Sequence, residues 1–125
     1  MTVYYTNEHE WIRVEGDIGV VGITAYAAEK LGDVVFVEVP DIGRKVKKDG
    51  DMAVVESVKA ASDVYAPVTG EVVAANDKLA DDLEILSRDP FGDGWIARIK
   101  ITDDSALKNL MDYAAYQKQC EEESH

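Results

Sequence analysis

The stretch MAVVESVKAASDVYA, residues 52–66, predicts the feature around which the rest of this chain is organised. Two apolar-rich runs, residues 52–57 and 62–66, flank the four residues VKAA, in which Lys59 is the charged member. Paired runs of this length are typical of two β-strands joined by a tight turn, which places Lys59 at or beside the tip of a hairpin. The turn contains no glycine or asparagine, so the prediction depends on the flanking runs and not on turn chemistry.

Further strands are expected on both sides of the hairpin, with turn signals at short and fairly regular spacing. Strand-like apolar runs cover residues 11–15, 18–23, 34–39, 71–75 and 95–101. Gly16-Asp17 separates the first two runs, and Pro40 ends the third. This pattern predicts a mainly β protein, either a sandwich or a barrel, in which residues 1–125 form one domain.

Helices are expected in two places. Thr24 is a suitable N-cap for a short alanine-rich helix over residues 25–31, and Gly32 stands where a helix commonly ends. A second helix is expected from Ser105 to about residues 116–119, followed by a frayed tail over 121–125. Its apolar residues recur at the three-and-four spacing of one buried face, at Leu107, Leu110, Met111 and Ala114.

Two charged segments are expected outside the regular elements. The acidic stretch 77–82 is expected to form a loop. The basic segment 44–48 is expected to be a solvated loop or sheet edge, because basic runs of this kind usually face water.

Net charge is the most pronounced property of the composition. Thirteen Lys and Arg residues against 25 Asp and Glu residues give a formal net charge of −12. Such a surface repels nucleic acids and anionic membranes and favours basic faces of partner proteins, although it also serves solubility alone. No run approaches the ~18–20 apolar residues needed to span a bilayer. The chain starts without a leader-like segment, so we expect a cytoplasmic protein, or a mitochondrial-matrix protein if this is a mature organellar form.

The sequence offers no arrangement that predicts catalysis or metal binding. The two histidines, His9 and His125, lie near opposite termini, so neither a Ser–His–acid nor a Cys–His constellation is expected. Together with Cys120 they lack the spacing of metal ligands, and no glycine-rich phosphate loop joins a strand to a helix. We therefore expect a non-catalytic protein that carries a group rather than transforming one.

Lys59 is the candidate attachment residue. A lysine at a turn is ordinarily a solvated charge, but Gly43 lies 16 residues before this one and Gly70 lies 11 after it. Both glycines are expected to mark turns that frame the hairpin. An attachment lysine needs a rigid, projecting turn, because a modifying enzyme must reach the amine and a long arm must later swing between sites. Acylation would convert the amine into an amide and remove one positive charge.

The segments ESVKA (56–60) and SDVYAPVTGEV (62–72) resemble the lipoylation segment of glycine cleavage H-proteins. Further segments resemble the same family over essentially the whole chain: HEW (9–11), VGIT (21–24) with Ala27, LGDVVFV (31–37), Asn76 with Leu79, and DPFGDGW (89–95). The Gly–Lys–Gly spacing is similar to that of the wider biotinyl/lipoyl family. The resemblance implies a flattened β-barrel or hammerhead sandwich with a short internal helix and a C-terminal helix.

The resemblance also implies a function. Lys59 would bear lipoate in amide linkage, and a monomeric carrier would take the aminomethyl group of glycine from one enzyme to the next. Its partners would be glycine decarboxylase (P-protein), aminomethyltransferase (T-protein), dihydrolipoamide dehydrogenase (L-protein) and a lipoate ligase or lipoyltransferase. Glu10 and Asp63 match positions that line a cleft for the arm and could bind its cationic amine, although they read equally well as ordinary surface acids. Glu56 matches the acid that could guide the modifying enzyme.

Two residues depart from the family pattern and keep an alternative open. Leu83 stands where the family has proline and Ser87 where it has asparagine, in a stretch expected to be a loop away from Lys59. They leave room for an H-like paralogue that donates lipoate to other carriers or serves another pathway.

Two other classes of carrier match the sequence less well. Biotin carriers flank the lysine with methionines, whereas Val58 and Ala60 flank it here. Lipoyl domains of the 2-oxo-acid dehydrogenases have Asp before the lysine, are shorter, and are tethered by Pro/Ala-rich linkers that this sequence lacks.

Overall fold

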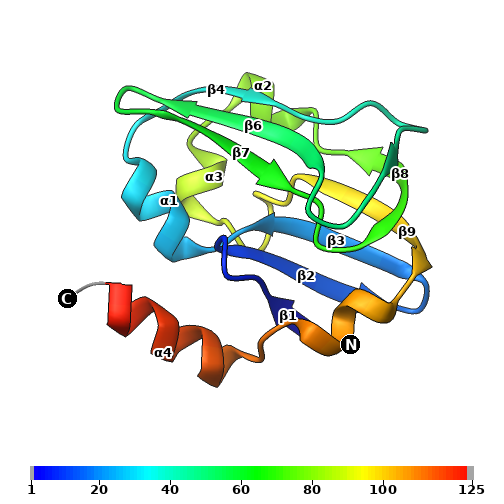
Figure 1. Ribbon diagram of the computed structural model, residues 1–125. Helices are drawn as coiled ribbons and strands as arrows, with labels where there is room; N and C mark the ends of the chain where they lie inside the picture. Colours follow the sequence, from blue (N-terminus) through cyan, green and yellow to red (C-terminus); the bar gives the residue numbers. More distant parts are fainter. Residues whose placement is uncertain (1, 124–125) are drawn as a thin grey trace.

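Two antiparallel β-sheets face each other in the computed structural model, which describes residues 2–123 (Figure 1). The larger sheet has the strand order β1-β2-β3-β9-β8-β5, and the smaller has the order β4-β6-β7. The strands are β1 (Thr2–Tyr5), β2 (Glu10–Glu15), β3 (Ile18–Ile23), β4 (Val34–Glu38), β5 (Lys45–Val46), β6 (Asp51–Ser57), β7 (Ala61–Tyr65), β8 (Thr69–Ala75) and β9 (Ala97–Asp103). The helices are α1 (Ala25–Leu31), α2 (Lys78–Asp81), α3 (Ile85–Arg88), the 3₁₀ helix η1 (Ser105–Asn109) and α4 (Tyr113–Glu123). The mainly β class is confirmed.

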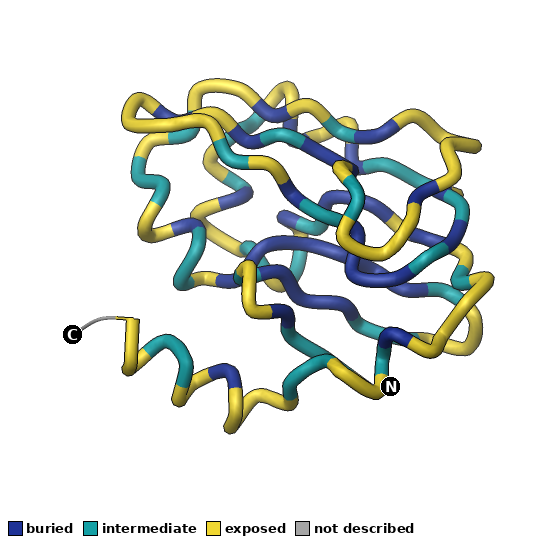
Figure 2. The backbone as a smooth tube through the Cα atoms, viewed as in Figure 1, coloured by how far each residue is buried: buried dark blue, intermediate teal, exposed yellow. Residues whose placement is uncertain are grey.

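Apolar side chains from both sheets fill the space between them. The core includes Ile12, Val21 and Ile99 of the larger sheet and Val37, Val55 and Val64 of the smaller, all of them buried. Figure 2 shows buried backbone running through the middle of the molecule, with exposed turns at its two ends. The sheets keep separate edges and do not close on each other, so the fold is a sandwich and not a barrel.

The predicted hairpin is confirmed as β6 and β7. The two strands pair antiparallel, with Val55 opposite Ser62 and Glu56 opposite Ala61, so that Lys59 lies in the turn between them. This turn projects at one end of the molecule, the end where α1 also lies (Figure 1).

Helix α1 begins and ends where the sequence predicts. The Ala27 N–H donates to Thr24 Oγ1 at 3.2 Å, and the Ala28 N–H donates to the Thr24 carbonyl at 3.0 Å, so Thr24 caps the helix. Gly32 follows with a φ of +72°, a conformation that L side chains rarely adopt. This glycine lets the chain turn sharply from α1 into β4.

The prediction of a loop over residues 77–82 is wrong, because the segment after β8 contains the helices α2 and α3. Although the segment is acidic, three of its leucines recur at helical spacing and pack toward the core. Leu79 and Leu86 are fully buried, and Leu83 between them is partly buried. The side-chain amide of Asn76 closes the segment by donating to the carbonyls of Asp93 and Trp95, each at 2.8 Å. The last strand, β9, starts at Ala97, two residues later than the run expected from residue 95.

The prediction of a single C-terminal helix from Ser105 is also wrong. The chain forms η1, breaks, and starts again as α4, because Met111 pairs with Tyr5 of β1 through backbone hydrogen bonds of 2.8 and 2.9 Å. Asp112 then accepts from the Ala115 N–H at 2.9 Å and caps α4. Of the four residues expected on one buried face, Ala114 is exposed and the other three are only partly buried.

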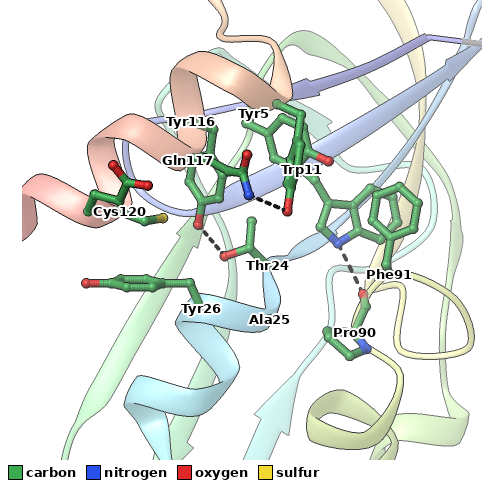
Figure 3. Close-up of a pocket in the computed structure, with 12 residues that line it drawn as sticks. Tyr5, Trp11, Thr24, Ala25, Tyr26, Pro90, Phe91, Tyr116, Gln117 and Cys120 are labelled. Carbon is green, nitrogen blue, oxygen red and sulfur yellow. Dashed lines mark hydrogen bonds between the residues drawn. The ribbon is translucent and has the colours of Figure 1, made fainter. Parts of the chain in front are cut away.

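Tyr116 anchors α4 to the sheets instead. It is buried, it stacks on Tyr5 at 4.9 Å between ring centroids, and its hydroxyl lies 2.6 Å from Thr24 Oγ1 (Figure 3). Residues 121–123 belong to α4 and are not a frayed tail, whereas residues 124–125 lie outside the described part of the chain. None of the described helices is long and apolar enough to cross a membrane.

The two framing glycines have different roles. Gly43 lies in the turn before β5 with a φ of +93°, as expected of a turn glycine. Gly70 lies inside β8, and a Cβ built there would come within 2.2 Å of the Lys100 carbonyl oxygen on β9. Gly70 therefore permits the close approach of two strands, which corrects the expectation that it marks a turn. The basic segment 44–48 was expected to be a loop or a sheet edge, and it contains the edge strand β5.

Candidate functional site

The turn that holds Lys59 is shaped by the hydroxyl of Ser57. Ser57 Oγ accepts hydrogen bonds from the backbone N–H groups of Lys59 and Ala60, each at 3.2 Å, and donates to the Ala60 carbonyl at 3.2 Å. The Ser57 N–H also donates to the Ala60 carbonyl at 2.8 Å. These bonds take the place of the glycine or asparagine that tight turns usually need, because a serine hydroxyl can close a turn on its own backbone. Lys59 itself is exposed.

The tip also rests against the corner between α1 and β4. The Val58 N–H donates to the Asp33 carbonyl at 3.1 Å. The Lys59 side chain passes over Gly32: its Cε and Nζ lie 3.7 and 3.8 Å from where a Cβ on Gly32 would stand. The lysine is therefore presented from a turn that is held by the Ser57 side chain and by a neighbouring element.

A groove of about 430 Å³ lies beside the tip, between α1 and the open edge of β7. Its lining combines apolar and charged side chains: Glu8, His9, Glu10, Ile23, Tyr26, Ala27, Lys30, Leu31, Val55, Ala60, Ser62, Asp63, Val64 and Glu123. The structure thus brings Glu10 and Asp63 together in one groove that reaches Ala60, the residue after the lysine. Glu56 does not line it; this residue is exposed on the outer face of the smaller sheet, opposite Phe36.

Glu10 is a buried carboxylate that joins the two sheets. Its side chain accepts a hydrogen bond from the Thr6 hydroxyl at 2.8 Å and another from the Tyr65 N–H, at the end of β7, also at 2.8 Å. With only 3% of its surface exposed, Glu10 is not the surface acid that the sequence allowed. Burial raises its pKa to about 7, against the opposing effect of the two hydrogen bonds, so it changes charge near neutral pH.

The C-terminal helix α4 supplies one groove residue that the sequence did not point to, Glu123, and His9 links this helix to the groove. His9 has a φ of +67°, and its ring stacks on Tyr26 at 4.7 Å. Its Nδ1 lies 2.8 Å from the Tyr116 hydroxyl and its Nε2 lies 3.1 Å from Glu123 Oε1. Burial raises the pKa of Tyr116, so its hydroxyl keeps its proton at neutral pH. These interactions hold the last turn of α4 against the groove, where Glu123 forms part of the wall.

A second hollow, of about 480 Å³, lies on the other side of Tyr26, between α4 and the body (Figure 3). Half of its lining residues are aromatic, among them Tyr5, Trp11, Phe91 and Tyr116. The Trp11 indole N–H donates to the carbonyls of Ile23 and Pro90, so this ring is fixed in place. The hollow contains neither Glu10 nor Asp63, and the hairpin contributes none of its lining. The groove beside Lys59 is therefore the candidate site.

The two residues that depart from the family pattern lie nearer to the site than expected. Leu83 follows α2, and Ser87 lies in α3 and not in a loop. Both line a hollow of about 530 Å³ together with Gly32 and Asp33, the corner against which the hairpin tip rests. Within residues 2–123, the His, Cys, Asp and Glu side chains form no group that could hold a metal ion.

The comparison with protein families identifies the chain. A family model described as glycine cleavage H-protein matches residues 3–123. The chain belongs to the glycine cleavage H-protein family. The resemblance inferred from the sequence is thereby confirmed, and so is the function in glycine cleavage that it implied.

Individual H-proteins agree with this chain over nearly their whole length. The glycine cleavage system H protein of Phenylobacterium zucineum is 57% identical over 112 residues, which are 90% of this chain and 93% of the relative. That of Bradyrhizobium diazoefficiens is 57% identical over 115 residues, covering 92% and 94%. The crystal structure of the H protein from Mycobacterium marinum superimposes with a TM-score of 0.86 at 36% identity, covering 94% of both chains. The H-protein fold is therefore shared as well as the sequence.

Removing the Ser57 hydroxyl is expected to loosen the turn. Ser57→Ala deletes the acceptor for two tip N–H groups, which should lower the free energy of unfolding by about 1 kcal/mol. Amide exchange measured by NMR should become faster at Lys59 and Ala60 than at the other hairpin amides. Ser57→Thr keeps the hydroxyl and should retain the parent exchange rates at both positions. Unchanged exchange in the alanine variant would show that the hydroxyl does not hold the tip.

The raised pKa of Glu10 predicts a pH-dependent stability difference. Because the folded-state pKa of about 7 exceeds the ordinary value of 4.5, the folded chain binds more protons than the unfolded chain between these values. The contribution of Glu10 to stability therefore falls as pH rises from about 4.5 to 7. Glu10→Gln cannot ionise, so relative to the parent it should become more stable across that window, by at most roughly 3 kcal/mol.

Urea denaturation of both proteins from pH 4 to pH 8 measures this difference. Glu15→Gln removes an exposed carboxylate from the same strand and controls for the loss of one charge. A constant stability difference between the glutamine variant at position 10 and the parent over this range would contradict the raised pKa.

Proposed function

We propose that this chain is the lipoyl carrier of glycine cleavage and that lipoate is joined as an amide to Nζ of Lys59. One observation carries the proposal: Lys59 is exposed on a turn fixed by Ser57, directly beside a groove that contains Glu10 and Asp63. In this role the chain presents a group to enzymes and has no catalytic residue of its own.

The groove has the chemistry that a lipoyl arm requires. Apolar side chains of Ile23, Leu31, Val55 and Val64 line it and suit an alkyl chain. When bound, the group would supply a dithiolane, a cyclic disulfide that two electrons and two protons convert into a dithiol and whose sulfur can hold a one-carbon cargo. The residues of this chain would hold the arm, and the apolar walls would exclude water from it.

Glu10 and Asp63 would act on the cationic amine of the cargo. A positive charge near a carboxylate favours its ionised form, so a bound amine would lower the pKa of Glu10 below its value of about 7. The same coupling makes amine binding tighter as pH rises through 7. The Tyr65 N–H and the Thr6 hydroxyl keep the Glu10 side chain oriented while its charge changes.

The partners follow from membership of the system. We infer that P-protein, T-protein and L-protein act on the arm in turn and that a lipoate ligase or lipoyltransferase attaches it. The net charge of −12 favours basic faces on these proteins. We also propose that the carrier acts as a monomer in the cytoplasm.

A lipoyl donor that passes lipoate to other carriers is the second candidate. The observation that favours it is the position of Leu83 and Ser87, which line the hollow that borders the Gly32–Asp33 corner under the tip. Departures from the family pattern at that place could alter which enzymes approach the lysine. The two functions can coexist in one chain.

A glycine-dependent carbon dioxide exchange assay with purified P-protein tests the proposal. The lipoylated parent chain should support exchange, and Lys59→Arg should reduce it to the level seen without any carrier. Lys47→Arg, which changes an exposed lysine of the basic segment, should behave as the parent.

The outcomes separate the alternatives. Exchange supported by the Lys59→Arg chain would show that Lys59 is not the attachment residue. A parent chain that bears lipoate yet supports no exchange would instead be a lipoyl donor or a carrier for another pathway.

A further inference from the structure

Exposed apolar side chains gather around the hairpin tip. Seven large apolar residues are exposed in the described chain, and three of them lie on β4 or in the turn: Val35 at 53%, Phe36 at 46% and Val58 at 69%. We name these three residues the tip strip. Exposed apolar residues that stand singly need no explanation, but a set at one place usually marks a contact surface.

A β-bulge creates part of this exposure. Val34 pairs with Ser57 and Phe36 pairs with Glu56, so Val35 is an extra residue in β4. Val37, next along the strand, faces the core at 6% exposure. Regular alternation would turn Val35 inward, whereas the bulge leaves both Val35 and Phe36 exposed. Bulges of this kind re-aim side chains at edges and beside functional sites, and β4 is an edge of the smaller sheet.

We propose that the tip strip is the docking surface for the enzyme that acylates Lys59, a protein with an apolar contact face and a basic rim. This inference rests on the proposed attachment at Lys59. The basic rim follows from the exposed acids beside the strip, Asp33, Glu38 and Glu56, which would meet opposite charges on the partner. Aromatic and aliphatic side chains ringed by charges are typical of interface centres.

The place of the reaction distinguishes this enzyme from the other partners, because acylation takes place at Nζ of Lys59 itself. Amide formation joins the acyl carbon to Lys59 Nζ, breaks the bond between that carbon and its activating group, and releases a proton. The acyl group must therefore be brought to Nζ itself, which lies against the Gly32 corner where β4 begins. Enzymes that act on the far end of the finished arm work at an arm's length from the tip and need not touch the strip.

The test measures lipoylation of the purified, unmodified chain by a lipoate ligase with lipoate and ATP, followed by intact mass over a range of chain concentrations. Phe36→Ser and Val58→Ser each remove one member of the strip. Ile42→Ser is the matched control, because Ile42 is 70% exposed and lies in the segment between β4 and β5. That segment leaves β4 at the end opposite the hairpin tip (Figure 1).

Each strip variant should raise the KM for the chain at least tenfold with kcat within twofold of the parent, and Ile42→Ser should leave both within twofold. A KM for both strip variants equal to that of Ile42→Ser overturns the inference. A fall in kcat without a change in KM also overturns it, because it would indicate misplacement of Lys59 and not weaker docking. Circular dichroism and melting temperature confirm that the variants remain folded.

A second measurement separates this enzyme from the other partners. Variants lipoylated to completion by prolonged incubation should be reduced and reoxidised by dihydrolipoamide dehydrogenase at the parent rate. An equal loss in both assays would overturn the assignment of the strip to the acylating enzyme. A parent chain that takes up no lipoyl group on Lys59 would instead overturn the proposed function, so the two failures are distinguishable.

Discussion

The hydrogen bonds from Thr6 and Tyr65 to the buried Glu10 carboxylate are the interaction on which the site depends. The Tyr65 bond joins the end of β7 in the smaller sheet to Glu10 at the start of β2 in the larger sheet, and the Thr6 bond holds the same side chain in place. An apolar pair at this place would connect the sheets at lower cost of desolvation. The retained carboxylate has a pKa of about 7, which makes the floor of the groove responsive to a cation that enters it.

Rigidity at the tip and openness beside it follow from different parts of the chain. Ser57 closes the turn locally, and the Asp33 carbonyl holds it from outside through the Val58 N–H. The groove, in contrast, is bounded at one side by α4, which Tyr116 and His9 attach to the body through a few polar and ring interactions. The lysine is thus held in place, whereas one wall of the groove beside it is held by few contacts. This combination suits an attached group that enzymes must reach and that the groove must shield from water.

Most of the strands, the hairpin and α1 could be predicted because their signals are local: apolar runs of strand length, a threonine cap and a terminal glycine. The break before α4 could not, since it results from the pairing of Met111 with Tyr5, far apart in the sequence. The helices after β8 were not predicted, because the many acidic residues of that segment are typical of a loop. Leu79, Leu83 and Leu86 nevertheless recur at helical spacing. Within the site, Ser57 had a local signal as a turn-forming serine. The burial of Glu10 had none, because Tyr65 is 55 residues away.

Mass spectrometry can show whether Lys59 carries a lipoyl group. The chain would be expressed with lipoate and a competent ligase, and its intact mass and peptide map would then be measured. One lipoyl adduct is expected, located on the peptide that contains Lys59. An unmodified chain under these conditions, or an adduct on another residue, would contradict this expectation.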